Sequence, residues 1–205
     1  MESIVNSIVT GVVSGLQAKV VSLEEDMKCL KDANQSLVKR VSHLESVCDE
    51  AEQYSRRLNL RISGLNETAD ENTEAKVLEV CKSLNADFKP RDIDRSHRVG
   101  RPPNNTHRPL TRPVIVRFTS YKARQAIFKG RSKLKTSQFR GVFLNEDLTK
   151  TRDNLLYQAR RLLKNRQLNG AWSYDGSILI KDLHNKVIRI SSAQDLDPFK
   201  LPSSE

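Results

Sequence analysis

Basic side chains crowd the middle of this chain, and they are the residues whose chemistry is easiest to interpret. Residues 91–140 hold 14 lysines and arginines against 2 aspartates, within a chain of net charge +10. Like charges this dense repel one another unless a partner neutralises them, and phosphate backbones are the commonest polyanions that do so. The pattern therefore predicts a surface that binds nucleic acid, mainly through its phosphates.

The candidate phosphate contacts lie on three expected strands, on a Pro-rich loop, after a helix and along the last helix. Any one of them alone could equally be an ordinary solvated charge, so the prediction depends on the collective excess. The candidates are Arg61, Arg95, Arg98, Arg101, Arg108, Arg112, Arg117, Lys133, Lys135, Arg152, Arg160, Arg161 and Lys164.

Residues suited to catalysis or metal binding are few. Glu146 and Asp147 are adjacent, and a metal nuclease would need such carboxylates, but the pair more naturally caps the helix that follows. His97 has no nucleophile motif around it, and the three cysteines form no CxxC or Cys/His cluster. We therefore expect no enzyme activity, no metal and no cofactor, and the odd cysteine count fits a reducing compartment.

A heptad repeat must position these cations, because it runs through the first quarter of the chain. Valine, methionine, asparagine or cysteine occupies each a position from residue 13 to residue 48, and leucine occupies the d positions from residue 16 to residue 44. Such a seam predicts a coiled coil over residues 1–55. The opposite charges at g and e positions favour parallel strands in register. The residues expected to set the oligomer are Leu16, Leu23, Leu30, Asn34, Leu37, Arg40, Val41, Leu44 and Glu45.

Strands and helices alternate after residue 56. The hydrophobic pattern predicts strands over 58–62, 93–99, 114–118 and 142–144, with helices after Asn72 and after Ser120. That order is β-α-β-β-α-β, the split unit of ferredoxin-like domains and RNA-recognition modules. The Pro-rich segment 100–112 can only be a loop.

A smaller unit is expected at the C-terminus. A helix over about 149–167 precedes a hairpin at Asp175–Gly176 and a further strand over 187–190. The fold class is therefore α+β. The expected domains are a coiled coil (1–55), an RNA-recognition-like module (56–145), a small helix-plus-hairpin domain (146–199) and a disordered tail (200–205).

Aromatic residues are scarce on the expected sheet. RNA-recognition modules stack bases on rings of the two central strands, but Asn59, Arg61 and Arg117 occupy such positions here, and Phe118 can face the core. Binding should then depend on phosphates, with a steep salt dependence and little sequence preference. Trp172 and Tyr174 are candidates for stacking, although packing in the hairpin core is the favoured role.

Four segments together carry a resemblance to a known family. They are Arg57–Gly64 (RLNLRISG), Ile93–Gly100 (IDRSHRVG), Arg112–Phe118 (RPVIVRF) and Val142–Thr149 (VFLNEDLT). In order and spacing they resemble the first-open-reading-frame proteins of LINE-type retrotransposons. The C-terminal part, with its Tyr174–Gly176 hairpin, is similar to the C-terminal domain of baculoviral few-polyhedra proteins.

The resemblance implies a coiled coil, an RNA-recognition-like module and a C-terminal domain that together coat the element's RNA. It implies single-stranded RNA binding and nucleic-acid chaperone activity, with single-stranded DNA as a further ligand. It also implies parallel trimers, and Arg40–Glu45 fits a motif associated with them. The generic a and d preferences favour two strands instead. We expect a homotrimer, with the dimer as the alternative.

The competing interpretation is a domesticated or viral coiled-coil adaptor whose globular part binds protein. Neither a signal peptide nor a membrane span is expected, because the N-terminal apolar residues lead directly into the heptads. We expect a cytoplasmic protein of ribonucleoprotein particles, with the nucleus as the alternative location.

Overall fold

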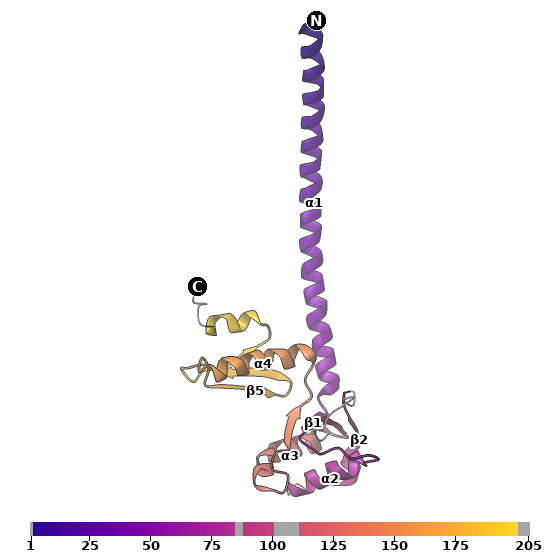
Figure 1. Ribbon diagram of the computed structural model, residues 1–205, viewed down its shortest axis with the longest axis vertical. Helices are drawn as coiled ribbons and strands as arrows, with labels where there is room; N and C mark the ends of the chain where they lie inside the picture. Colours follow the sequence, from indigo (N-terminus) through magenta and orange to yellow (C-terminus); the bar gives the residue numbers. More distant parts are fainter. Residues whose placement is uncertain (1, 85–87, 101–110, 201–205) are drawn as a thin grey trace. The chain divides into compact units, whose positions relative to one another are not determined.

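The computed structural model describes residues 2–84, 88–100 and 111–200, and the chain divides into two compact units, Met1–Cys48 and Asp49–Glu205. One helix, α1 (Glu2–Arg56), makes up the described part of the first unit and ends in the second (Figure 1). The long N-terminal helix that the heptad repeat predicts is therefore confirmed over the described residues. Its leucines at d are exposed in the single chain, up to 70% for Leu30. The coiled coil itself needs a second chain and stays a prediction.

The second unit contains a four-stranded antiparallel sheet with two helices packed on one face. Its elements are β1 (Asn59–Ser63), α2 (Thr73–Ser83), β2 (Ile93–Arg98), β3 (Val114–Phe118), α3 (Tyr121–Gly130) and β4 (Phe143–Glu146). The spatial order is β2-β3-β1-β4, so β4 and β2 are the edge strands. Two short 3₁₀ helices, η1 (Pro90–Asp92) and η2 (Arg131–Thr136), precede β2 and follow α3.

Alternation of side chains decides which face of this sheet is covered. Leu60 and Ile62 on β1, with Val114 and Val116 on β3, are buried against apolar residues of α2 and α3. Their neighbours along each strand must then point to the other face, because successive side chains alternate. Both helices begin where the sequence predicted, at side-chain caps from Asn72 and Ser120.

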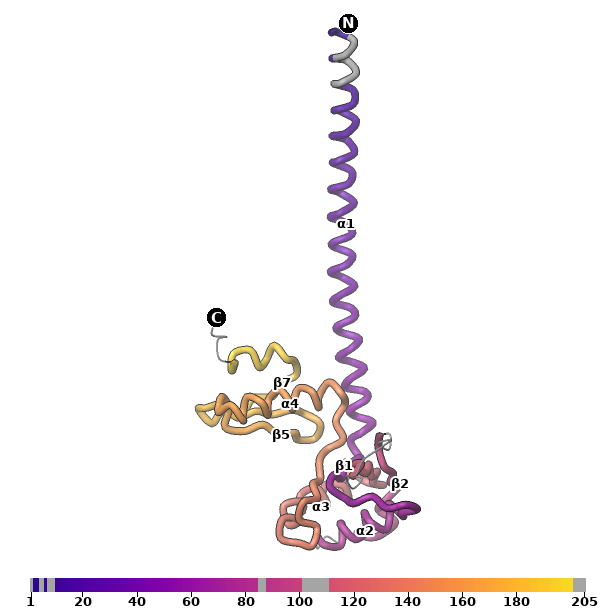
Figure 2. Tube along the Cα trace, viewed as in Figure 1, coloured from indigo at the N-terminus to yellow at the C-terminus, as the bar shows by residue number. Residues whose placement is uncertain are grey.

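A second, three-stranded sheet follows, with the order β5-β6-β7. It comprises β5 (Gly170–Tyr174), β6 (Ser177–Lys181) and β7 (Val187–Ile190), and α4 (Lys150–Lys164) packs on it through its own apolar core (Figure 2). Asp175 and Gly176 both have positive φ, 50° and 78°, as the tight turn between β5 and β6 requires. A last 3₁₀ helix, η3 (Gln194–Phe199), ends the described chain.

The order of these elements agrees with the predicted one, and the differences are at the ends. The fourth strand begins at Phe143 and reaches Glu146, and α4 ends at Lys164. The chain is thus mixed helix and antiparallel sheet, as predicted. The predicted tail falls, apart from Lys200, outside the described residues. Among the residues described, no helix is both long and apolar enough to cross a membrane.

Candidate nucleic-acid interface

The uncovered face of the four-stranded sheet brings together three of the predicted arginines. Arg95 on β2 is directly opposite Arg117 on β3, and Arg117 is in turn opposite Asn59 on β1. Paired residues of neighbouring strands lie on the same face, so Arg61, two residues after Asn59, points the same way. Arg117 has an exposed ion pair with Asp94, whose Oδ2 lies 3.5 Å from Arg117 Nε.

A cleft of about 270 Å³ opens on this face beside the last turn of α1. Arg56, Arg95, His97 and Arg117 supply basic groups to its wall, and Asp147 is its one carboxylate. A groove with this excess of positive charge suits a flexible strand that presents one phosphate after another.

Arg61 lies on this face and also contacts a buried carboxylate. Its Nη2 lies 3.2 Å from Asp147 Oδ1, and Arg56 Nη1 lies 3.2 Å from the same oxygen. Asn59 Nδ2 donates to the other oxygen of Asp147 at 3.1 Å. The carboxylate therefore orients both guanidiniums at the edge of the cleft, and about a third of the Arg61 side chain stays exposed.

Arg98 is placed differently from the other arginines of β2. Its guanidinium is 5% exposed and is bonded to Glu71 through Nε at 2.5 Å and Nη2 at 3.0 Å. It also donates to main-chain oxygens of Leu65 and Asn66, both at 2.9 Å. The hydrogen bond from Arg98 is the main reason that the pKa of Glu71 falls to about 2, and Lys76 adds to it. In this position Arg98 connects the β1–α2 loop to β2.

Arg112, just before β3, is paired in a similar way. It donates from Nε to both oxygens of Glu67, at 3.1 and 3.0 Å, and from Nη1 to the carbonyl of Gly100 at 2.7 Å. The hydrogen bond with Arg112 lowers the pKa of Glu67, and the pKa of Arg112 is raised in return. Arg101 and Arg108 lie outside the described residues.

The cations predicted on α4 divide into a paired arginine and exposed side chains. Arg152 Nε bonds Asp49 Oδ2 at 2.7 Å, and its Nη1 donates to the carbonyl of Gly176 at 3.0 Å. Arg160, Arg161 and Lys164 are exposed along the helix. Arg152 therefore contacts both the end of α1 and the hairpin, and the other three remain available to a phosphate.

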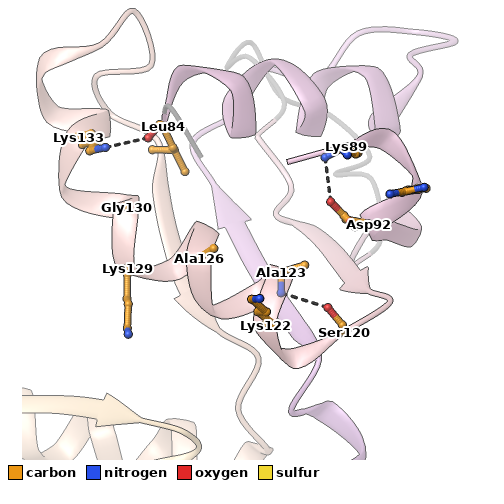
Figure 3. Close-up of a pocket in the computed structure, with 11 residues that line it drawn as sticks. Leu84, Lys89, Asp92, Ser120, Lys122, Ala123, Ala126, Lys129, Gly130 and Lys133 are labelled. Carbon is orange, nitrogen blue, oxygen red and sulfur yellow. Dashed lines mark hydrogen bonds between the residues drawn. The ribbon is translucent and has the colours of Figure 1, made fainter. Parts of the chain in front are cut away.

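Lys133 and Lys135 lie on η2, near the helices that cover the sheet. Lys133 Nζ donates to the carbonyl of Leu84 at 3.1 Å, at one end of a basic groove of about 640 Å³ (Figure 3). Lys89, Lys122 and Lys129 line the same groove, and Asp92 is the one acid among the described residues that line it. Lys135 is exposed and belongs to a neighbouring groove.

The predicted role of Glu146 and Asp147 as helix caps is wrong. Thr149 caps α4, and its hydroxyl accepts from the Arg152 amide at 3.3 Å. Glu146 accepts from Arg124 Nη2 at 2.6 Å and from the amides of Asp175 and Gly176 at 2.8 and 3.2 Å. The two carboxylates point to different partners, because successive side chains of an extended chain diverge. No group of three or more metal-ligating side chains occurs in the residues that the structure describes.

Two functional features were missed by the sequence interpretation. Phe143 begins β4 and is 60% exposed, although the segment around it reads as a buried strand. Arg124, an ordinary charge in the sequence of α3, is 2% exposed and forms an ion pair with Glu146. Side chains alternate along a strand, so inward positions for Val142, Leu144 and Glu146 would have placed the Phe143 side chain outward.

The hairpin aromatics do not pack as predicted. Tyr174 is 58% exposed, which contradicts a place in the hairpin core, and Trp172 is only partly buried on the same side of β5. Phe118, in contrast, is in the main core and edge-on to Phe88.

Burial raises the pKa of the Cys81 thiol to about 12, so this cysteine stays protonated at neutral pH.

A scan of the chain against protein-family models found no match, and a search of the curated proteins found none either.

Proposed function

We propose that this chain is an oligomeric protein that binds single-stranded RNA and acts as a nucleic-acid chaperone, of the kind encoded by the first open reading frame of LINE-type retrotransposons. The observation that carries the proposal is the pairing of Arg95 with Arg117 on the uncovered sheet face, beside the basic cleft. Two adjacent cations with little acidic compensation gain most from a partner that brings negative charge.

The arrangement of the sheet supports an RNA-recognition-like module. The strand order β2-β3-β1-β4, with α2 and α3 on one face, is the order expected for a β-α-β-β-α-β unit of ferredoxin-like type. Domains of this type present the uncovered face of the sheet to RNA. In this chain, arginine and asparagine on β1 and arginine on β3 replace the usual rings, which favours backbone contacts over base recognition.

The exposed apolar stripe of α1 supports self-association. Leu16, Leu23, Leu30, Leu37 and Leu44 are each more than half exposed in the single chain. At about 25 cal/mol per Å² of apolar area, covering this stripe with copies of itself is strongly favourable. We propose a parallel homotrimer, in which Arg40 and Glu45 form the interchain ion pairs of the trimer motif, and a dimer is the alternative.

Chaperone action would follow from many weak phosphate contacts. Clustered cations screen the repulsion between two strands and so allow them to pair. Because each contact is weak and mobile, strands can also separate and exchange. The proposed setting is a ribonucleoprotein particle in the cytoplasm that contains the element's own transcript.

A salt-titrated binding curve tests this function. The double variant Arg95→Ala/Arg117→Ala should bind a labelled single-stranded RNA more weakly and flatten the plot of log K against log salt by about 1 to 2 units, because each lost phosphate contact removes about 0.7 from the slope. Lys82→Ala is the matched control, since Lys82 is an exposed cation on α2 that lines none of the basic grooves described above.

An unchanged salt slope in the double variant would move the RNA site away from the sheet face. If the unaltered protein ignores RNA at low salt, the proposal fails as a whole. The adaptor interpretation would then be favoured, with the globular unit binding protein.

A further inference from the structure

A second basic groove, distinct from the sheet-face cleft, lies between η2 and the edge strand β4. It has a volume of about 900 Å³, which is within the usual size of ligand sites. Four cations line it: Lys129, Arg131, Lys135 and Arg140. No acidic side chain lines this groove among the residues described, so its charge is uncompensated.

Phe143 is the exposed aromatic residue of this groove. Its register partner on β1 is Ser63, a small residue, so the adjacent strand leaves the ring uncovered. The backbone just before β4 approaches the end of β1 closely, which requires glycine at position 64, because a Cβ there would lie 2.3 Å from the carbonyl oxygen of Gly141. The pairing of β4 with β1 places Phe143 at the edge of the sheet.

Asn145 lies two residues further along β4, on the same face as Phe143, and lines the same groove. Its side-chain amide offers two N–H donors and one carbonyl acceptor. A flat ring, an amide and four cations in one groove match the three parts of a nucleotide: the base face, the base edge and the phosphate.

We propose that Phe143 is a base-stacking platform for single-stranded nucleic acid. One base lies on the ring, the amide of Asn145 faces the edge of that base, and the flanking phosphates contact Lys135 and Arg140. This inference rests on the proposed function and deepens it, because it adds a contact with a base to a surface otherwise suited to phosphates. The groove lies at the edge of the sheet, so a strand bound to the open face could continue into it.

The charge of the groove favours a nucleotide over an apolar protein segment. An exposed phenylalanine alone could equally dock on protein. Arg131, however, is fixed beside the groove, with its guanidinium 4.1 Å from the centre of the Phe128 ring and its Nη1 donating to the Phe128 carbonyl at 2.8 Å. A peptide would leave these cations without partners, whereas a polynucleotide supplies a phosphate for every base.

The test compares Phe143→Ala with Phe143→Tyr in the full-length protein. The probes are labelled oligoadenylate and an abasic strand of the same length, which keeps the phosphates and lacks the bases. Phe143→Ala should weaken oligoadenylate binding about tenfold, in the range that loss of one base–aromatic stack produces, and should leave abasic binding unchanged. Phe143→Tyr keeps the ring and should bind like the unaltered protein.

The double variant Lys135→Ala/Arg140→Ala should instead weaken both probes to a similar degree, since it removes phosphate contacts. Because the Phe143 side chain is mostly exposed, its replacement should leave the circular dichroism spectrum unchanged. Unchanged oligoadenylate binding by Phe143→Ala would overturn the stacking platform, and so would equal losses for both probes. If the unaltered protein bound neither probe, the proposed function itself would have failed.

Discussion

Glu71 receives two cations at once, and they hold the pKa of this carboxylate well below its ordinary value. Lys76 Nζ donates to its Oε2 at 2.6 Å, the oxygen that also accepts from Arg98 Nη2, and the Glu71 side chain is only 7% exposed. The pKa of about 2 lies below the ordinary 4.5, because the hydrogen bonds favour the charged form. A carboxylate with a depressed pKa stabilises the fold above its ordinary pKa, and this contribution fades as the pH falls toward the folded value.

Glu71→Gln should therefore lower the free energy of unfolding by about 1 to 3 kcal/mol at neutral pH, the range for hydrogen bonds to charged groups. The difference from the unaltered protein should shrink as the pH falls from 4.5 to 2. Urea unfolding at several pH values measures both effects, and Glu79→Gln, which changes an exposed carboxylate on the following helix α2, is the matched control. A difference that stayed constant down to pH 2 would contradict the role given to Glu71.

At the scale of elements, a buried ion pair joins α3, β4 and the β5–β6 hairpin. Glu146 accepts from Arg124 and from the two turn amides, and both side chains are almost fully buried. Gln53, near the end of α1, adds a second connection by donating to the carbonyl of Asp147 and accepting from the amide of Thr149, at 3.1 and 3.0 Å. The segment between the two sheets is therefore anchored from three sides.

Glu146→Gln should destabilise the second unit by about 3 kcal/mol or more, because it leaves the Arg124 guanidinium buried without a counter-charge. Hydrogen exchange at the amides of Asp175 and Gly176 should become faster than at other amides. A general loss of stability would not affect these two amides in particular. Adding Arg124→Met to this variant should recover part of the loss, and Lys150→Ala serves as the exposed control. If Glu146→Gln destabilised the protein no more than Lys150→Ala does, this ion pair would not have the stabilising role argued for it.

Elements were predictable from the sequence to the extent that their signals are local. The strand Val114–Phe118, the helix start near Asn72 and the cap at Ser120 were predicted from neighbouring residues only, and the structure agrees with them. Pairings across long sequence separations leave no such signal. The contact of Arg98 with Glu71, 27 residues apart, could not be read from spacing, and neither could the contact of Arg124 with Glu146.

The same limit applies to the candidate site. Charge density located the basic region, yet it could not separate arginines that face solvent from those already paired. Arg95 and Arg117 lie on the open face, where the ion pair of Arg117 with Asp94 is exposed, whereas Arg98 and Arg112 each bind a carboxylate that is mostly buried. Phe143 was missed because its neighbours Val142 and Leu144 gave the segment a buried character.

At the scale of the whole molecule, self-association would decide how tightly RNA is bound. In the proposed function, each globular unit would offer phosphate contacts that are individually weak. If α1 assembles copies of the chain, a strand bound by one unit meets the next at high effective concentration, and avidity exceeds the single-unit affinity by about 10²- to 10⁴-fold. In the single chain, Leu30 and Leu37 are exposed and pack on nothing else that the structure describes, so replacing them should affect assembly alone.

The variant Leu30→Asn/Leu37→Asn tests this avidity directly. It should be a monomer by light scattering and should bind long single-stranded RNA at least tenfold more weakly, while a short strand that fits one unit loses little affinity. Ser22→Asn/Ser36→Asn is the matched control, because the two serines occupy outward c positions of the same heptad repeat and asparagine there leaves the seam intact. Equal affinity of the monomeric variant for long RNA would show that single units bind independently, and a monomeric unaltered protein would show that the apolar stripe of α1 is covered by something other than a second copy.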